Sequence, residues 1–181
     1  TPLITWTGSA STNWNTAANW SPAAVPASTN NINIPTTGIT NFPVVSGLTI
    51  ANGATMTLNA NARLTVNGTL TNNGTLTLES GATLVQGTAS ILAGTGGTYT
   101  VKQAVTGAND GSNNPNGRFW YIGSPVSSSS SSVLFLGAND VVKKRDEPNN
   151  TWTALTSGSE NLAVGRGYYM RTTQSTPTIN F

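Results

Sequence analysis

A short alternating repeat between Leu48 and Gly87 is the feature that most constrains the fold of this chain. Apolar and polar residues alternate within four short segments, Leu48–Ile50, Met56–Leu58, Leu64–Val66 and Leu76–Leu78. Alternation with a period of two is typical of β-strands. Turn signals separate the segments, at Asn52-Gly53, Asn67-Gly68, Asn73-Gly74 and Ser80-Gly81, and Asn-Gly is the strongest of them. The stretch therefore predicts very short strands joined by tight corners.

Strands this short favour a wound coil over a sheet of hairpins, whose strands have about five or six residues each. Leu48, Val66 and Leu84 are evenly spaced along the chain, and Leu58 and Leu76 repeat the same interval. The interval is close to the repeat of about 20 residues that is expected for one turn of a solenoid. We therefore predict an all-β chain that contains a short right-handed parallel β-helix of two or three coils, with these residues stacked inward. A β-sandwich meander has the same alternation and remains the alternative.

The composition excludes several classes of function. The chain has no cysteine and no histidine, which excludes thiol chemistry and removes the commonest general base and metal ligand. Only 8% of its 181 residues are charged, so Thr, Ser and Asn must form most of the surface. The basic run Lys143–Arg145 is followed at once by Asp146-Glu147, and it is not the basic cluster that nucleic-acid binding requires. No apolar stretch reaches the roughly 20 residues of a membrane helix.

The start of the chain is rich in tryptophan. Trp6, Trp14 and Trp20 account for three of the five tryptophans in the chain. The terminal coil of a solenoid needs a cap, and large rings can close it because each buries about 150–250 Å². The alternative is a glycan platform, since exposed rings stack on sugar faces. We favour the cap.

The pattern changes after Gly97. Longer strand patterns follow at 99–105, 118–122, 141–145, 151–155 and 168–171. We predict a capped parallel β-helix over residues 1–97 and an antiparallel, β-sandwich-like domain over residues 98–181. The serine run 127–132 is expected to be a surface loop. The last residues, 178–181, are typical of a strand in progress, so we expect the second domain to be truncated at its C-terminus.

The search for catalytic and metal sites finds no strong candidate. A glycosidase needs two carboxylates roughly 5–10 Å apart, and the only adjacent acidic pair, Asp146-Glu147, lies in a charged turn. Some polysaccharide lyases are β-helices, and they need charged catalytic residues. The repeat between Leu48 and Gly87 contains only two charged residues, Arg63 and Glu79. The turns 109–111 and 139–140 could supply calcium ligands, although Asx-turns explain them better. We therefore expect no catalytic residue, no metal site and no cofactor.

Several motifs carry a resemblance to a known kind of protein. The opening TWTGSASTNWNTAANWSPAAVP, followed by NINIP, resembles the start of adhesin-like β-helical modules in large secreted or surface proteins of Bacteroidota. The later segments GRFWYIGSPV, VVKKRDEPNNTWTAL and LAVGRGYYMRT resemble strands of the same modules, in the same order. The resemblance implies adhesion or matrix building, and export by the type IX secretion system. It implies no shared catalytic residues.

These observations predict a non-enzymatic extracellular module with a structural or adhesive role at the bacterial cell surface. Its expected partners are other protein copies or surface glycans, and exposed strand edges would allow self-assembly as a repeat or subunit of a filament. The alternative is a carbohydrate-binding module, and a polysaccharide lyase or hydrolase is the weakest candidate. The candidate contact residues for glycans or partners are Trp6, Trp14, Trp20, Trp120 and Trp152.

Overall fold

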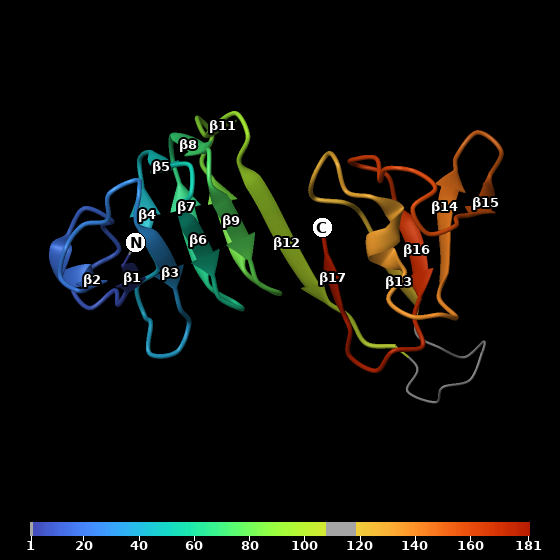
Figure 1. Cartoon of the computed structure of the whole chain (residues 1–181), viewed down its shortest axis with the longest axis horizontal. Coiled ribbons are helices and arrows are strands. Elements are labelled where there is room, and N and C mark those ends of the chain that lie inside the picture. The colour runs from blue at the N-terminus through green and yellow to red at the C-terminus, as the bar shows by residue number, and fades with distance from the viewer. Residues whose placement is uncertain (1, 108–118) are drawn as a thin grey trace. The chain divides into compact units, whose positions relative to one another are not determined.

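The structure is a computed structural model that describes residues 2–107 and 119–181. The chain divides into two compact units, Thr1–Thr100 and Val101–Phe181. Each unit consists mainly of β-strands and turns, and the described residues include two short 3-10 helices (Figure 1). Each unit has its own hydrophobic core.

Unit 1 is a β-solenoid with three walls. The first wall contains β3 (Asn31–Ile34), β6 (Thr55–Leu58) and β9 (Thr75–Leu78). The second contains β4 (Val44–Val45), β7 (Arg63–Val66) and β10 (Thr83–Gln86). The third contains β5 (Leu48–Ile50), β8 (Thr69–Asn72) and β11 (Ile91–Ala93). Neighbouring strands within these walls pair in parallel, so the predicted parallel β-helix is confirmed, with about three turns.

One turn of the coil contains more residues than the spacing of Leu48, Val66 and Leu84 predicted. Leu84 lies opposite Leu64 rather than Val66, and Leu48 lies opposite Leu70 rather than Val66. The predicted partners were therefore wrong. The predicted inward face was right, because a shift by an even number of residues leaves each side chain on the same face of its strand.

The interior of the solenoid is a continuous column of aliphatic side chains. The side chains with no exposed surface include Met56, Leu58, Leu64, Val66, Leu70 and Leu76. Threonines alternate with them and point outward or lie half-buried. Burying one such aliphatic side chain contributes about 1.5–3 kcal/mol relative to leaving it in water. The stacked coils therefore stabilise one another.

Tryptophans close the N-terminal end of this core. β1 (Leu3–Trp6) pairs in parallel with β3 and antiparallel with β2 (Trp20–Ser21), and the 3-10 helix η1 (Ala17–Asn19) precedes β2. The Trp14 and Trp20 rings meet edge to face with centroids 4.7 Å apart. Trp20 Nε1 donates a hydrogen bond to the Trp14 carbonyl oxygen at 2.8 Å. The predicted tryptophan cap is confirmed.

Unit 2 is built on antiparallel pairing, as predicted. Its four-stranded sheet has the order β13 (Phe119–Ile122), β16 (Tyr168–Arg171), β14 (Val141–Asp146) and β15 (Thr151–Ala154). The later residues of β12 (Thr98–Ala104) pair antiparallel with β17 (Thr178–Asn180). The buried core of this unit contains Val105, Leu134, Val142, Leu162, Tyr168, Met170 and Ile179.

The serine run is not the surface loop that the sequence predicted. Ser131 begins the 3-10 helix η2 (Ser131–Leu134) and is completely buried, and Ser129 is nearly so. Ser130 caps the helix by accepting a hydrogen bond from the Ser132 backbone N–H. Because Leu134 packs into the core, Ser129 and Ser131 are buried near it, whereas Ser127, Ser128 and Ser132 are exposed.

Candidate functional site

The four-stranded sheet of unit 2 has one buried face and one face toward solvent. Tyr168, Met170 and Val142 are completely or almost completely buried. Their neighbours along the strands point to the opposite face, because successive side chains alternate. On that outer face the register places Tyr121 opposite Tyr169, and Tyr169 opposite Lys143. The outer face therefore collects aromatic and basic side chains from several strands.

Four aromatic rings converge on the outer face. We call them the aromatic platform: Phe119, Tyr121, Trp152 and Tyr169. Tyr121 is 74% exposed, Phe119 42% and Trp152 40%. The Trp152 and Tyr169 ring centroids lie 5.7 Å apart and the Tyr121 and Trp152 centroids 6.1 Å apart, with the rings tilted. An exposed apolar patch with a polar border is typical of a binding surface.

Two cations lie against these rings. The Arg145 guanidinium carbon is 5.5 Å from the centroid of the Trp152 ring. Lys143 Nζ is 5.9 Å from the centroid of Tyr169. Both distances fall within the range of cation–π attraction. Arg145 is also held by an ion pair with Glu147 at 3.5 Å and by a hydrogen bond to the Asn150 side chain.

The platform surrounds a small hollow of about 150 Å³, lined by Tyr121, Lys143, Trp152 and Tyr169. This volume is below the roughly 300–1,000 Å³ of a small-molecule pocket, so it suits one ring of a longer ligand. Burial raises the pKa of Tyr169 above its usual value of 10.0, the charge of Arg171 opposes this shift, and Tyr121 adds to it. The Tyr169 hydroxyl is therefore neutral at physiological pH and available as a hydrogen-bond donor.

Comparison with known protein families assigns the chain to one family. A family model described as a domain of unknown function, DUF8693, matches residues 5–181. The chain belongs to the DUF8693 family. No curated protein matches this DUF8693 domain, and no solved structure does.

The structure separates the five tryptophans that the sequence singled out. Trp6, Trp14 and Trp20 are at most 4% exposed, so their rings present no face to a glycan. Trp120 is half-buried, and its Nε1 donates a hydrogen bond to the Thr106 carbonyl oxygen at 2.8 Å. Trp152 is the member of the set that lies on the platform of this DUF8693 domain.

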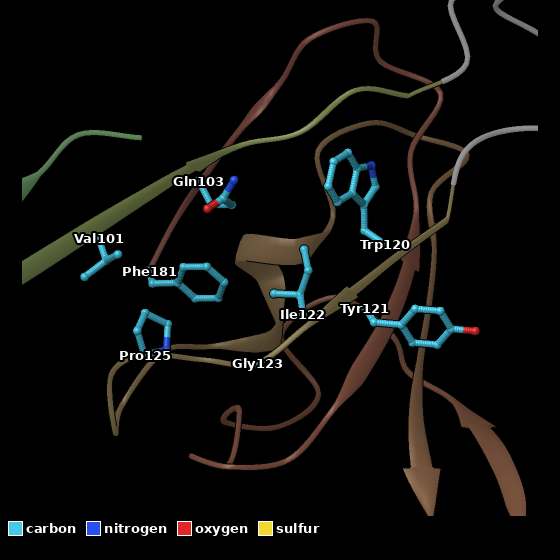
Figure 2. Close-up of a pocket in the computed structure, with 8 residues that line it drawn as sticks. All are labelled: Val101, Gln103, Trp120, Tyr121, Ile122, Gly123, Pro125 and Phe181. Carbon is cyan, nitrogen blue, oxygen red and sulfur yellow. The ribbon is translucent and has the colours of Figure 1, made fainter. Parts of the chain in front are cut away.

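Another hollow lies on the other side of β13. It has a volume of about 430 Å³, and its lining includes Val101, Gln103, Ile122 and Phe181. Figure 2 shows the Tyr121 side chain pointing away from Ile122 and Phe181. None of the residues that line this hollow is charged. Gln103 supplies an uncharged amide there, whereas the outer face adds two cations to its exposed rings, so the outer face is the stronger candidate.

Sequence reasoning missed most of the platform. It named Trp120 and Trp152 but not Phe119, Tyr121 or Tyr169. One signal was present: in a strand that buries Trp120 and Ile122 on one face, Phe119 and Tyr121 must share the other. The strand pattern alone does not say which of these faces meets solvent.

The acidic residues of this domain offer no clear chemistry. No group of three or more carboxylates among the described residues is placed to hold a metal ion. Asp140, one candidate calcium ligand, accepts hydrogen bonds from the backbone N–H groups of Leu136, Gly137 and Thr173. The other candidate turn, 109–111, lies outside the described residues.

Two remaining observations concern Arg63 in the solenoid and the character of the helices. Arg63, which the sequence offered as a basic residue of the rungs, lies over the Phe42 ring at 5.8 Å. No described helix has the length and apolar character needed to span a membrane.

Proposed function

We propose that this DUF8693 domain is a non-enzymatic adhesive module of an extracellular bacterial surface protein, and that it binds carbohydrate on the aromatic platform. The observation that carries the proposal is the exposure of Tyr121 and Trp152 beside Tyr169 on one sheet face. Exposed rings offer an apolar face and a polar tip, which suits the C–H faces and hydroxyl groups of sugars.

The solenoid by itself supports the structural part of this proposal. Its coils are joined by parallel backbone pairing along all three walls, and its interior is filled with aliphatic side chains. A coil of this kind resists bending because each rung contacts its neighbours over a continuous core. The resemblance of the motifs to surface modules of Bacteroidota supports an extracellular location and export by the type IX system.

A glycan array followed by titration calorimetry tests the proposal. We expect the intact domain to bind at least one glycan, and Tyr121→Ala and Trp152→Ala each to weaken that binding about tenfold or more, as for the loss of a main stacking ring. Val25→Ala is the matched control, because Val25 is an apolar residue of unit 1 that is 40% exposed, as Trp152 is. The proposal would be overturned if no glycan bound, or if Tyr121→Ala and Trp152→Ala both left the affinity unchanged.

Fluorescence gives an independent measurement. Trp152 is 40% exposed whereas Trp6, Trp14 and Trp20 are nearly inaccessible. A sugar stacked on the platform should therefore change the emission of Trp152, and the change should disappear in Trp152→Phe. A ligand-induced change that persists in this variant would place the sugar elsewhere.

A second candidate function is assembly into a surface filament. β10 and β11 are edge strands of their walls, and Val85, Ile91 and Leu92 on them are 37%, 60% and 49% exposed. Exposed apolar edge strands are templates for pairing with another chain. Electron microscopy and sedimentation at high concentration test this candidate, with Val85→Lys as the variant that should block assembly. Strictly monomeric particles of the wild-type protein would count against it.

A further inference from the structure

Lys143 differs from its neighbours in β14. Lys144 Nζ forms an ion pair with Glu160 at 2.5 Å, and Arg145 forms one with Glu147 at 3.5 Å. Lys143 is half-buried and lines the platform hollow, yet its ammonium group has no acidic partner among the described residues. Its Nζ lies over the Tyr169 ring, 5.9 Å from the ring centroid.

A half-buried lysine whose Nζ lies over one ring, in a hollow lined by two more rings and with no carboxylate beside it among the described residues, is suited to pair with an anion of a ligand. We propose that the ligand of the platform is an anionic polysaccharide, and that a carboxylate or sulfate group on one sugar pairs with Lys143. The apolar face of the same sugar would lie against Tyr121 and Trp152. This inference rests on the proposed carbohydrate-binding function and adds the class of glycan to it.

The surface next to the platform supports a repeating anion. Arg145, which contacts the platform through Trp152, also lines a separate hollow of about 460 Å³ together with Arg166 and Glu147. We call this the basic hollow. Arg145 is already held by Glu147 and Asn150. Arg166 is therefore the residue of this hollow that we expect to take an acidic group, since arginine binds carboxylates and sulfate-like groups with two parallel hydrogen bonds. A chain with an acidic group on successive sugars fits this arrangement better than a single free sugar acid.

Single-stranded nucleic acid also combines negative charge with flat rings. The observations favour the glycan, because nucleic-acid surfaces track the phosphate backbone with clustered basic residues. Here the two arginines of the basic hollow share it with Glu147. Binding to an oligonucleotide is therefore an outcome that the experiment must include.

The experiment compares matched polymers. Calorimetry would measure binding of the intact chain to polygalacturonate and its fully methyl-esterified form, to chondroitin and chondroitin sulfate, and to oligothymidylate. We expect at least tenfold tighter binding to one acidic polymer than to its less charged partner. Lys143→Gln should remove about tenfold of that affinity, as for the loss of one charge-assisted hydrogen bond. Lys144→Gln is the matched control, because it removes the same charge one residue away on the opposite face.

Each outcome of this experiment either supports or overturns the inference. Preference for polygalacturonate identifies a carboxylate as the group read by Lys143, and preference for chondroitin sulfate identifies a sulfate. Equal binding of polygalacturonate and its methyl ester, together with equal binding of chondroitin sulfate and chondroitin, overturns the inference but leaves the proposed function intact, whereas no binding to these polymers or to any arrayed glycan overturns both. Tighter binding of oligothymidylate, or equal losses in Lys143→Gln and Lys144→Gln, also overturns the inference.

Discussion

Trp6 and Trp20 lie opposite each other in the β1–β2 pair, and their rings meet edge to face with centroids 4.8 Å apart. Trp6 has no exposed surface, and its Nε1 donates a hydrogen bond to the Asn41 carbonyl oxygen at 2.7 Å. The pair therefore joins the N-terminal segment to the first coil and excludes water from that end of the aliphatic core.

Replacing Trp6 with alanine should destabilise unit 1 severely. The change removes a buried ring and leaves the Asn41 carbonyl group without its donor, so we expect a loss of about 3–5 kcal/mol in the free energy of unfolding. Urea unfolding followed by circular dichroism measures it. Trp152→Ala is the control, since Trp152 is 40% exposed and its loss should cost less than about 1 kcal/mol. Equal losses in the two variants would contradict the capping role.

Gly68 should tolerate no side chain. A Cβ atom there would lie 1.9 Å from the carbonyl oxygen of Ser46, so Gly68→Ala must push two successive coils apart. We expect a loss of about 1–3 kcal/mol, measured as a lower urea midpoint. At Gly47 the nearest atom to such a Cβ is the Thr69 carbonyl oxygen at 3.6 Å. Gly47→Ala should therefore be nearly neutral, and an equal effect of the two changes would show that the corner is not tightly packed.

Asp140 should be a structural anchor of unit 2. Its Oδ2 accepts hydrogen bonds from the Leu136 and Gly137 backbone N–H groups at 2.6 and 2.8 Å, and its Oδ1 accepts one from Thr173 at 3.2 Å. Asp140→Ala leaves all three donors unpaired and should cost about 1–3 kcal/mol or more. Asp140→Asn keeps one acceptor oxygen and should cost less. Thermal unfolding measures both, and added calcium should not alter either result.

Tyr169 should make unit 2 sensitive to alkali. Burial raises the pKa of its hydroxyl above 10.0 in the folded state. The unfolded chain therefore loses this proton first, and the free energy of unfolding falls as the pH rises above about 10. Below that pH both states keep the proton and the contribution is constant. Urea midpoints between about pH 8 and pH 11 should decline less steeply in Tyr169→Phe than in the wild type, and parallel declines would contradict the raised pKa.

The regular coils were the part of the fold that local sequence could predict. Alternation in Leu64–Val66 and the Asn67-Gly68 corner act over a few residues, so they are visible without any knowledge of distant contacts. Local sequence does not determine the partner of each strand. Segments around Leu58 and Leu76 present the same leucine–threonine pattern to several registers, and the observed partner of Leu58 in the following coil is Leu78. The lengths of the corners decide among these registers.

The candidate site depended more on tertiary structure. The sequence offered Trp120 and Trp152 as equal candidates for ligand contact, but only Trp152 lies on the outer face of the sheet. Trp120 faces the interior because Met170, its partner across the β13–β16 pair, packs in the core. Tyr121 and Tyr169 are thereby directed outward, beside Lys143.

Short strands with leucine inside and threonine outside were readable from local sequence, because that pattern depends only on the alternation of side chains along a strand. The sequence also determined that large rings were available to close one end. The pairing of one coil with the next, and the choice of aromatic residues that meet solvent, became visible with the folded chain. Those outcomes depend on packing between residues far apart in the chain, where the volume of the core selects one face of each strand for burial.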